Sequence, residues 1–325
     1  MTLSVDIALG LGSFRLEATV TAPSDGITVL FGPSGSGKST LLSVLAGLRH
    51  ADSGSIRLGG YALDGLPPHR RGMGLVFQDA RLFPHLSVRR NIAYAWKRAP
   101  EQKRPGIEAV AKFFDIASQL DRPVTNLSGG EKSRVALARA VAAAPDFLLL
   151  DEPFAALDGA RRRAFIQVLS DMHRNYRLPM MVVTHDIDDA AALATHLIAL
   201  KDGRVAAQGR FIDASRAPEF QSLLDSADMG RALPASSLRS SHGGRSLWLR
   251  ADQVLLAAEE PRAVSARNVL AGEVSAVVFE SEQSRLVELT TRNGVVLSRV
   301  TPEAVRDLGL APGKKAWALV KAHAV

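Results

Sequence analysis

The sequence predicts an α/β protein with two domains: a larger domain built on a mostly parallel sheet with a helical subdomain, and a small C-terminal β-barrel. Residues 1–230 alternate short apolar runs with helical segments. The runs GITVLF (26–31), FLLL (147–150) and MMVVT (180–184) are of the kind that is buried on both faces of a parallel sheet. From about residue 248 the pattern changes to strands and turns. A chain of 325 residues is long enough for two such domains.

Two segments interrupt this pattern. Between Asp79 and Leu127 the β patterning fades and helix formers dominate VRRNIAYAWKR and GIEAVAKFFDIASQL, so we expect a helical subdomain over 79–127. Residues 231–247 are rich in Ser and Gly and are expected to form a linker. The predicted domains are therefore 1–230 and 248–325.

The C-terminal segment carries the signals of a small OB-like barrel. LVELT (286–290) and VVLSRV (295–300) flank an Asn-Gly pair, which predicts a β-hairpin. TPEAVRDL begins with a Thr-Pro helix start, and AWALVKA supplies a final strand.

Composition excludes several classes of function. The chain has no cysteine, which excludes disulfides, thiolate metal sites and thiol catalysis. Its net charge of +7 is scattered without a basic run, so we expect no nucleic-acid partner. The N-terminus lacks the features of a signal peptide, and no apolar run reaches the 18 or so residues of a membrane span. We expect a cytoplasmic protein that reaches a membrane only through a partner.

GPSGSGKST follows an apolar strand-like run and precedes the helix-like LLSVLAGL, which is the context of a phosphate-binding loop. Glycines let backbone N–H groups turn toward phosphates at the positive end of a helix. Lys38 supplies a charge to the β- and γ-phosphates, and the Ser39 hydroxyl is suited to Mg²⁺. The predicted ATP-binding residues are Gly32, Pro33, Ser34, Gly35, Ser36, Gly37, Lys38, Ser39 and Thr40.

Two further motifs accompany the loop. FLLLDEP (147–153) ends an apolar strand in Asp151, a carboxylate for magnesium, followed by Glu152, which can polarise a water molecule. LSGGE (127–131) starts a helix and forms a second anion-binding cradle. Because one ATP does not need both cradles from one subunit, the sequence predicts a homodimer in which the second cradle faces the partner's nucleotide.

With these motifs in this order, residues 1 to about 230 resemble the nucleotide-binding subunit of ABC transporters. GPSGSGKST resembles the Walker A loop, Gln78 the Q-loop glutamine, LSGGE the signature motif, and FLLLDEP Walker B. ALD (156–158) resembles the D-loop and His185 the switch histidine. The resemblance implies ATP hydrolysis with Glu152 as catalytic base and with His185 and Gln78 as catalytic partners. It also implies Mg²⁺ at Ser39, Gln78 and Asp151, and contact with the partner's ATP by Leu127, Ser128, Gly129, Gly130, Glu131 and Asp158.

Two features depart from the commonest family pattern. The signature ends in Glu131 rather than Gln, a form that importer ATPases often show. The adenine-stacking aromatic is not evident from the sequence. Phe14 is the only aromatic residue before Phe31, and it fits either adenine stacking or the core.

The resemblance extends to the type of transporter. DARLFPHLSV follows Gln78, and in the family this region contacts the membrane subunit, so we expect two permease subunits to dock near Gln78–Val88, with Leu82, Phe83 and Pro84 at the contact. The protein would then be peripheral on the cytoplasmic face of the bacterial inner membrane, with a solute-binding protein as an indirect partner. FQDARLFPHLSV is most similar to importers of inorganic oxyanions, molybdate especially.

The stretch SARNVLAGEV (265–274) resembles the small Mop, or molbindin-like, domain that ends molybdate importer ATPases. Hydroxyl, guanidinium and ammonium groups suit a tetrahedral dianion, so Ser265, Arg267 and Lys321 are candidate oxyanion ligands. The alternative is that Arg267 and Asn268 only shape the entry to a strand. The leading function is thus the ATPase subunit of a molybdate importer. The alternatives are sulfate, tungstate or another oxyanion as cargo, or a soluble ABC ATPase that does not transport.

Overall fold

The structure is a computed structural model that describes residues 2–155, 157–238 and 246–321. Two compact units account for the chain. The first comprises Met1–His185 and Thr195–Gln208, and the second Asp186–Ala194 and Gly209–Val325. No helix in the described part of the chain is long and apolar enough to cross a membrane.

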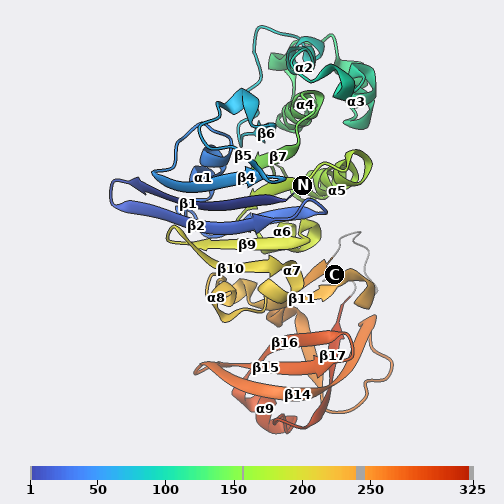
Figure 1. Ribbon diagram of the computed structural model, residues 1–325. Coiled ribbons are helices and arrows are strands. Elements are labelled where there is room, and N and C mark those ends of the chain that lie inside the picture. The colour runs from blue at the N-terminus through green and yellow to red at the C-terminus, as the bar shows by residue number, and fades with distance from the viewer. Residues whose placement is uncertain (1, 156, 239–245, 322–325) are drawn as a thin grey trace. The chain divides into compact units, whose positions relative to one another are not determined.

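The first unit is built on a ten-stranded sheet in the order β5-β4-β1-β2-β10-β9-β3-β8-β7-β6 (Figure 1). Its strands are β1 (Leu3–Leu11), β2 (Phe14–Ala22), β3 (Ile27–Phe31), β4 (Ser53–Leu58), β5 (Tyr61–Ala62), β6 (Met73–Val76), β7 (Phe147–Asp151), β8 (Met180–Thr184), β9 (His196–Lys201) and β10 (Arg204–Arg210).

The predicted parallel core is confirmed, and it is joined by an antiparallel region. β9, β3, β8, β7 and β6 pair in parallel, and β3 and β8 are buried at every position. β1 pairs antiparallel with both β2 and β4, and β4 with β5. The alternating burial of β1 shows a strand with one solvent-facing side, which explains why its sequence lacks a continuous apolar run.

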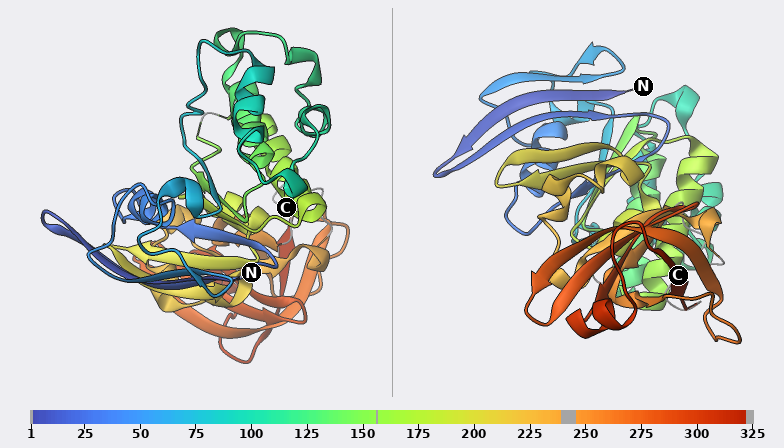
Figure 2. Two further views of the ribbon diagram at one scale, coloured as in Figure 1. Left: turned by 45° about the horizontal axis from the view of Figure 1, so that its top comes forward. Right: turned by 90° about the horizontal axis from the view of Figure 1, so that it is seen from below.

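The helices of the first unit are α1 (Lys38–Leu45), α2 (Val88–Trp96), α3 (Ile107–Phe113), α4 (Gly129–Ala142) and α5 (Gly159–Tyr176). Residues 79–127 contain α2 and α3 and no strand, which is the helical character that the sequence predicts. Figures 1 and 2 show α2 and α3 grouped with the N-terminal part of α4. α4 therefore connects this helical region to the strand β7, which follows it in the sequence.

The second unit contains a five-stranded antiparallel sheet in the order β13-β17-β14-β15-β16 and a hairpin of β11 with β12. Its strands are β11 (Gly230–Pro234), β12 (Ser246–Arg250), β13 (Val254–Ala257), β14 (Asn268–Ser281), β15 (Ser284–Thr291), β16 (Gly294–Val300) and β17 (Lys315–Val320). Its helices are α6 (Ile187–Leu193), α7 (Phe211–Ala214), α8 (Pro218–Gln221) and α9 (Pro302–Asp307).

The larger sheet of the second unit is strongly curled, as Figure 2 shows for the orange and red strands. The Ser298 hydroxyl on β16 donates a hydrogen bond of 2.6 Å to the carbonyl of Val254 on β13, which joins the two end strands of the sheet. Val274, Val287, Val296 and Val320 belong to its buried core. The predicted OB-like barrel is therefore confirmed.

Two details differ from the sequence prediction. The hairpin of β15 and β16 is present, but Thr291 pairs with Gly294, so the two loop residues are Arg292 and Asn293 rather than Asn and Gly. The Thr291 hydroxyl fixes this register by donating to the Gly294 carbonyl at 2.7 Å. Segment 231–247 was expected to be a linker, yet it includes most of β11 and the first residues of β12.

Residues before the expected domain boundary near 230 belong to the second unit. Phe211 and Phe220 pack edge-on against Trp248 of β12, with ring centroids 6.5 and 6.3 Å apart. Arg250 forms an ion pair of 2.8 Å with Asp188 of α6. These contacts join segments that are far apart in the sequence, and a composition change at residue 230 gives no sign of them.

Candidate nucleotide-binding site

The segment Gly32–Thr40 comprises the loop of residues 32–37 between β3 and α1 and the first residues of α1, as the sequence predicts. Gly37 is the N-cap of α1 with φ of 102°, a backbone conformation that side chains rarely adopt. A Cβ at this position would lie 2.9 Å from the Phe14 ring, so space as well as conformation requires glycine. The loop thus places backbone N–H groups at the positive end of a helix.

Lys38 lies buried beneath this loop. Its Nζ donates hydrogen bonds to the carbonyls of Gly32 at 2.7 Å and Pro33 at 2.8 Å. Burial lowers the pKa of Lys38, while Glu152 and Asp151 act in the opposite direction. The two hydrogen bonds therefore fix the ammonium group at the loop. Because both acceptors are uncharged carbonyls, an anion bound here would stabilise the charged form of Lys38.

Ser39 and Asp151 meet although they lie on different elements. The Ser39 hydroxyl, in the first turn of α1, donates to Oδ1 of Asp151 at the end of β7 at 3.1 Å. Burial raises the pKa of Asp151, and the hydrogen bond from Ser39 partly offsets this effect. Two hard oxygen atoms at one point match the ligand preference of Mg²⁺, so these residues fit a magnesium ion.

Glu152 directly follows β7 and has φ of 44°, in the left-handed region. A non-glycine residue there carries a strain of about 1–3 kcal/mol and is typical of functional positions. His185 follows the neighbouring strand β8, and its Nδ1 lies 3.5 Å from Oε1 of Glu152. The carboxyl ends of the two parallel strands thus bring these side chains together.

A cavity of about 480 Å³ opens at this loop. It is lined by Leu11, Phe14, Ser34, Gly35, Gly37, Lys38, Ser39, Thr40 and Glu152. Phe14 is partly buried: it packs against the core and also lines the wall of the cavity. The sequence did not indicate Leu11, because the β1–β2 hairpin that brings it here depends on tertiary pairing.

Gln78 does not line this cavity. It lies two residues beyond the end of β6 and is exposed. β6 pairs in parallel with β7, so Gln78 follows the same edge of the sheet as Asp151. The conformation of the loop at residues 77–81 therefore determines how far Gln78 lies from the other predicted magnesium ligands.

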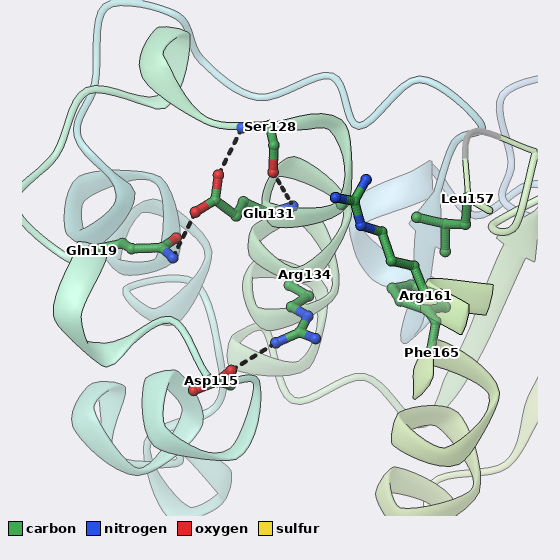
Figure 3. Close-up of a pocket in the computed structure, with 9 residues that line it drawn as sticks. Asp115, Gln119, Ser128, Glu131, Arg134, Leu157, Arg161 and Phe165 are labelled. Carbon is green, nitrogen blue, oxygen red and sulfur yellow. Dashed lines mark hydrogen bonds and ion pairs between the residues drawn. The ribbon is translucent and has the colours of Figure 1, made fainter. Parts of the chain in front are cut away.

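The signature residues form the N-terminus of α4. The Ser128 hydroxyl accepts from the Glu131 N–H, and Oε2 of Glu131 accepts from the Ser128 N–H at 2.7 Å, which is a capping box. Oε1 of Glu131 accepts from the Gln119 amide at 2.8 Å. Figure 3 shows the Glu131 carboxylate turned toward Ser128 and Gln119.

The other predicted signature contacts differ in exposure. The Leu127 side chain is buried, whereas Ser128 and Gly129 are exposed. A cavity of about 330 Å³ lies beside them, bounded on the other side by Leu157 and Arg161 (Figure 3). Asp158 caps α5 by accepting from the Arg161 N–H. Ala156 of the expected D-loop lies outside the described residues.

The predicted docking residues lie in the segment between β6 and α2. Leu82 and Phe83 are partly buried and Pro84 is exposed. Phe83 stacks on Tyr94 with ring centroids 4.6 Å apart. The Phe83 ring therefore packs against α2, and Pro84 lies at the surface.

The three oxyanion candidates lie in the second unit and are all exposed. Asn268 of β14 pairs with Val320 of β17, and Arg267 and Lys321 are the residues that adjoin this last pair in the sequence. Ser265 is two residues before Arg267. Within the described part of the chain, the side chains of Arg267 and Lys321 make no hydrogen bond or ion pair.

Comparisons with known proteins agree with this geometry. A family model described as ABC transporter matches residues 17–155, and one described as TOBE domain matches residues 264–325. The molybdenum import ATP-binding protein ModC of Rhizobium etli is 35% identical and covers 100% of this chain and 99% of its own length. ModC 1 of Azotobacter vinelandii is 37% identical and covers 96% and 95%.

Solved structures with the same fold cover the ATPase part. An ATP-binding cassette solved as a dimer with ADP and Pi has a TM-score of 0.57 and 26% identity, and covers 65% of this chain and 98% of its own. CbiO1 from Clostridium perfringens, part of an ABC transporter complex, has a TM-score of 0.58 and 27% identity, and covers 68% and 92%.

The sheet, the phosphate loop and the capped signature helix define an ATP-hydrolysing subunit of the ABC transporter class. The full-length identity and the C-terminal TOBE match narrow this class further. The chain belongs to the family of molybdenum import ATP-binding proteins, the ModC family.

Proposed function

We propose that this chain energises the uptake of molybdate as the ATPase subunit of a membrane importer. The observation that carries the proposal is the cavity in which Lys38, Ser39 and Glu152 converge at the phosphate loop. The relatives that match over their full length are molybdenum import proteins, which supports molybdate as cargo. The chain by itself transports nothing, because the path through the membrane belongs to its partners.

ATP binds along the loop from Gly32 to Thr40. The backbone N–H groups at the start of α1 hold the phosphates, and Lys38 moves part of its hydrogen bonding from loop carbonyls to phosphate oxygens. Phe14, at the wall of the cavity, offers a flat apolar surface for the base.

Glu152 acts as the general base for hydrolysis. Its carboxylate accepts a proton from the attacking water, which is aligned with the γ-phosphate. The Nδ1 of His185 lies 3.5 Å from Oε1 of Glu152. The His185 ring donates a hydrogen bond that orients the carboxylate relative to the γ-phosphate. Water is activated only when the nucleotide is enclosed, because a carboxylate has more effect at low dielectric.

Magnesium would be held by Ser39 and Asp151, with Gln78 as a further oxygen ligand. The ion supplies charge neutralisation at the β- and γ-phosphate oxygens. Asp151, whose pKa burial raises, gains a cationic partner when the ion binds, which favours its ionised form.

Two subunits form a homodimer in which each signature faces the partner's nucleotide. Ser128, Gly129 and Gly130 supply the hydroxyl and N–H groups for the γ-phosphate, and Asp158 follows Leu157, which lines the cavity beside the signature. Glu131 holds Ser128 through the capping box rather than contacting phosphate itself, since its two oxygens are already engaged.

The dimer docks on two permease subunits through the segment Gln78–Val88 and lies peripherally on the cytoplasmic face of the bacterial inner membrane. A solute-binding protein delivers cargo to the permease. ATP-driven closure of the dimer moves this segment and so changes the access state of the permease, and hydrolysis resets the cycle.

The C-terminal barrel binds molybdate with Ser265, Arg267 and Lys321. Arg267 and Lys321 adjoin the last pair of the β14–β17 ladder, and neither has an anionic partner in the described part of the chain. A dianion would supply the counter-charge that these two cations lack. All three residues are exposed, so a second barrel would be needed to enclose the anion.

The ATPase assignment is tested with Glu152→Gln, using Glu219→Gln on α8 of the second unit as a charge-matched control. Glu152→Gln should bind ATP, hydrolyse it at least about a hundredfold more slowly and accumulate as an ATP-dependent dimer in light scattering. The control should behave as the wild type does. A wild-type rate in Glu152→Gln would show that another group is the base.

The cargo is tested in the complex with its permease in liposomes. Binding protein loaded with molybdate should stimulate ATP hydrolysis more than the same protein loaded with sulfate; equal or reversed stimulation would favour a different oxyanion. Calorimetry of the full chain with molybdate, tungstate and sulfate tests the barrel. The absence of heat with all three would give the barrel a structural role only.

A further inference from the structure

Arg139 lies half-buried on α4, where its guanidinium contacts backbone carbonyls. Its Nη1 donates to the carbonyl of Arg81 at 2.9 Å and its Nη2 to the carbonyl of Ala80 at 3.2 Å. Within the described residues it forms no ion pair, and burial lowers its pKa. A guanidinium withdrawn from water without an anion is costly, so these two carbonyls are the groups that hold it in place.

Those carbonyls belong to the loop that follows Gln78. Arg81 has φ of 44°, a left-handed conformation that persists in a non-glycine residue only where neighbours impose it. The Arg81 guanidinium folds back over the ring of Phe77, 3.6 Å from its centroid. Residues 77–81 therefore form a compact loop that carries Gln78 and is fastened at its far end by Arg139.

Arg139 also adjoins the docking segment. Its guanidinium carbon lies 5.4 Å from the centroid of the Phe83 ring. The Phe83 backbone is held by buried Asn91, which accepts from its N–H at 2.9 Å and donates to its carbonyl at 3.2 Å. One side chain thus touches both the Gln78 loop and the surface around Phe83.

Ser128 is the N-cap of the same helix. Arg139 lies eleven positions after Ser128, which corresponds to about 16 Å of helix, since each residue rises about 1.5 Å. We propose that Arg139 is a positioning residue that fixes the loop carrying Gln78 to the signature helix, so that the two move as one body when ATP is enclosed. This inference rests on the proposed ATPase function.

The test compares Arg139→Met and Arg139→Lys in the full chain. Arg139→Met should release the loop, so that trypsin cleaves after Arg81 about fivefold faster, followed by mass spectrometry. Its kcat should fall about tenfold while KM for ATP stays within about twofold, because the phosphate loop is untouched. Arg139→Lys should give a cleavage rate and a kcat between those of Arg139→Met and the wild type. Its ammonium keeps the charge but lacks the planar guanidinium that donates to two carbonyls at once.

Arg90→Met is the matched control, since Arg90 is an exposed arginine of α2 whose side chain makes no hydrogen bond or ion pair with the described residues. It should leave both readouts unchanged. Unchanged cleavage after Arg81 in Arg139→Met overturns the proposal, as does faster cleavage with an unaltered kcat. If Arg139→Met does not fold, the same criteria apply to Arg139→Lys. A wild-type chain that hydrolyses no ATP would overturn the proposed function, whereas the cleavage assay would still report the loop.

Discussion

The capping box at the start of α4 gives the sharpest prediction about the signature. The Glu131 carboxylate accepts hydrogen bonds from the Ser128 N–H at 2.7 Å and from the Gln119 amide at 2.8 Å. Glu131→Ala removes both acceptors and leaves the Ser128 N–H without its partner. Glu131→Gln keeps one acceptor oxygen for the Ser128 N–H, but it loses the charge and places an NH2 group instead of an oxygen opposite the Gln119 amide.

The expected magnitudes follow from these contacts. Loss of a capping interaction costs about 1 kcal/mol of unfolding free energy, so Glu131→Ala should lower Tm by roughly 2–4 °C in a unit of this size. Glu131→Gln loses the favourable charge at the helix N-terminus, which is about 0.3–1 kcal/mol. We therefore expect Ala to be more damaging than Gln in both stability and ATPase rate.

The Tm difference between the wild type and Glu131→Gln should depend on pH. The backbone N–H of Ser128 is the main cause that lowers the pKa of Glu131 below its ordinary value of 4.5. The stabilisation by the ionised carboxylate is thus fully present above 4.5 and is lost as pH falls through the lower, folded-state pKa. The Gln side chain does not titrate, so the difference in Tm between wild type and Glu131→Gln should shrink on acidification.

Thermal unfolding followed by circular dichroism at pH 7 and at about pH 4, with ATPase assays at neutral pH, measures these differences. The reasoning is refuted if Glu131→Ala has the same Tm as the wild type, or if Glu131→Gln lowers Tm as much as Glu131→Ala does. A difference between wild type and Gln that does not change with pH would refute the carboxylate contribution.

The remaining predictions concern the phosphate loop. Lys38→Ala should weaken ATP binding by about tenfold to a hundredfold in calorimetry, because a charged hydrogen-bond donor to phosphate is lost; wild-type affinity would contradict the placement of Lys38. Burial raises the pKa of Asp151, so its ionised form costs stability above that pKa and Asp151→Asn should raise Tm at pH 7. The same variant should lose Mg²⁺-dependent ATPase activity, and a lower Tm at pH 7 would contradict the sign of the burial effect.

Much of the candidate site could be predicted because its motifs are local. A phosphate loop needs a strand, a turn and a helix in immediate succession, and GPSGSGKST carries these in one stretch. Asp151 ends a strand and Glu152 follows it, and His185 follows the neighbouring strand in the sheet, so parallel pairing alone brings them together. The hairpin over 284–300 and the helix start at Thr301 were predictable for the same reason.

Other features depend on residues distant in the sequence. Arg139 reaches carbonyls 58 and 59 positions earlier, and Gln119 completes the bonding of Glu131 from a neighbouring turn. Nothing in the one-dimensional pattern distinguishes Arg139 from other arginines on a helix. Its role became visible only when the fold placed an uncompensated cation against the loop after Gln78.

The sequence by itself determined the class of chemistry, the order of the motifs and the type of each domain, because backbone geometry within a few residues sets those properties. Only the tertiary structure decided that α6 and residues 209–229 pack with the C-terminal unit, and that Glu131 turns toward its own helix cap. Such choices follow from long-range packing and hydrogen bonding, whose free energy depends on partners that local sequence does not specify.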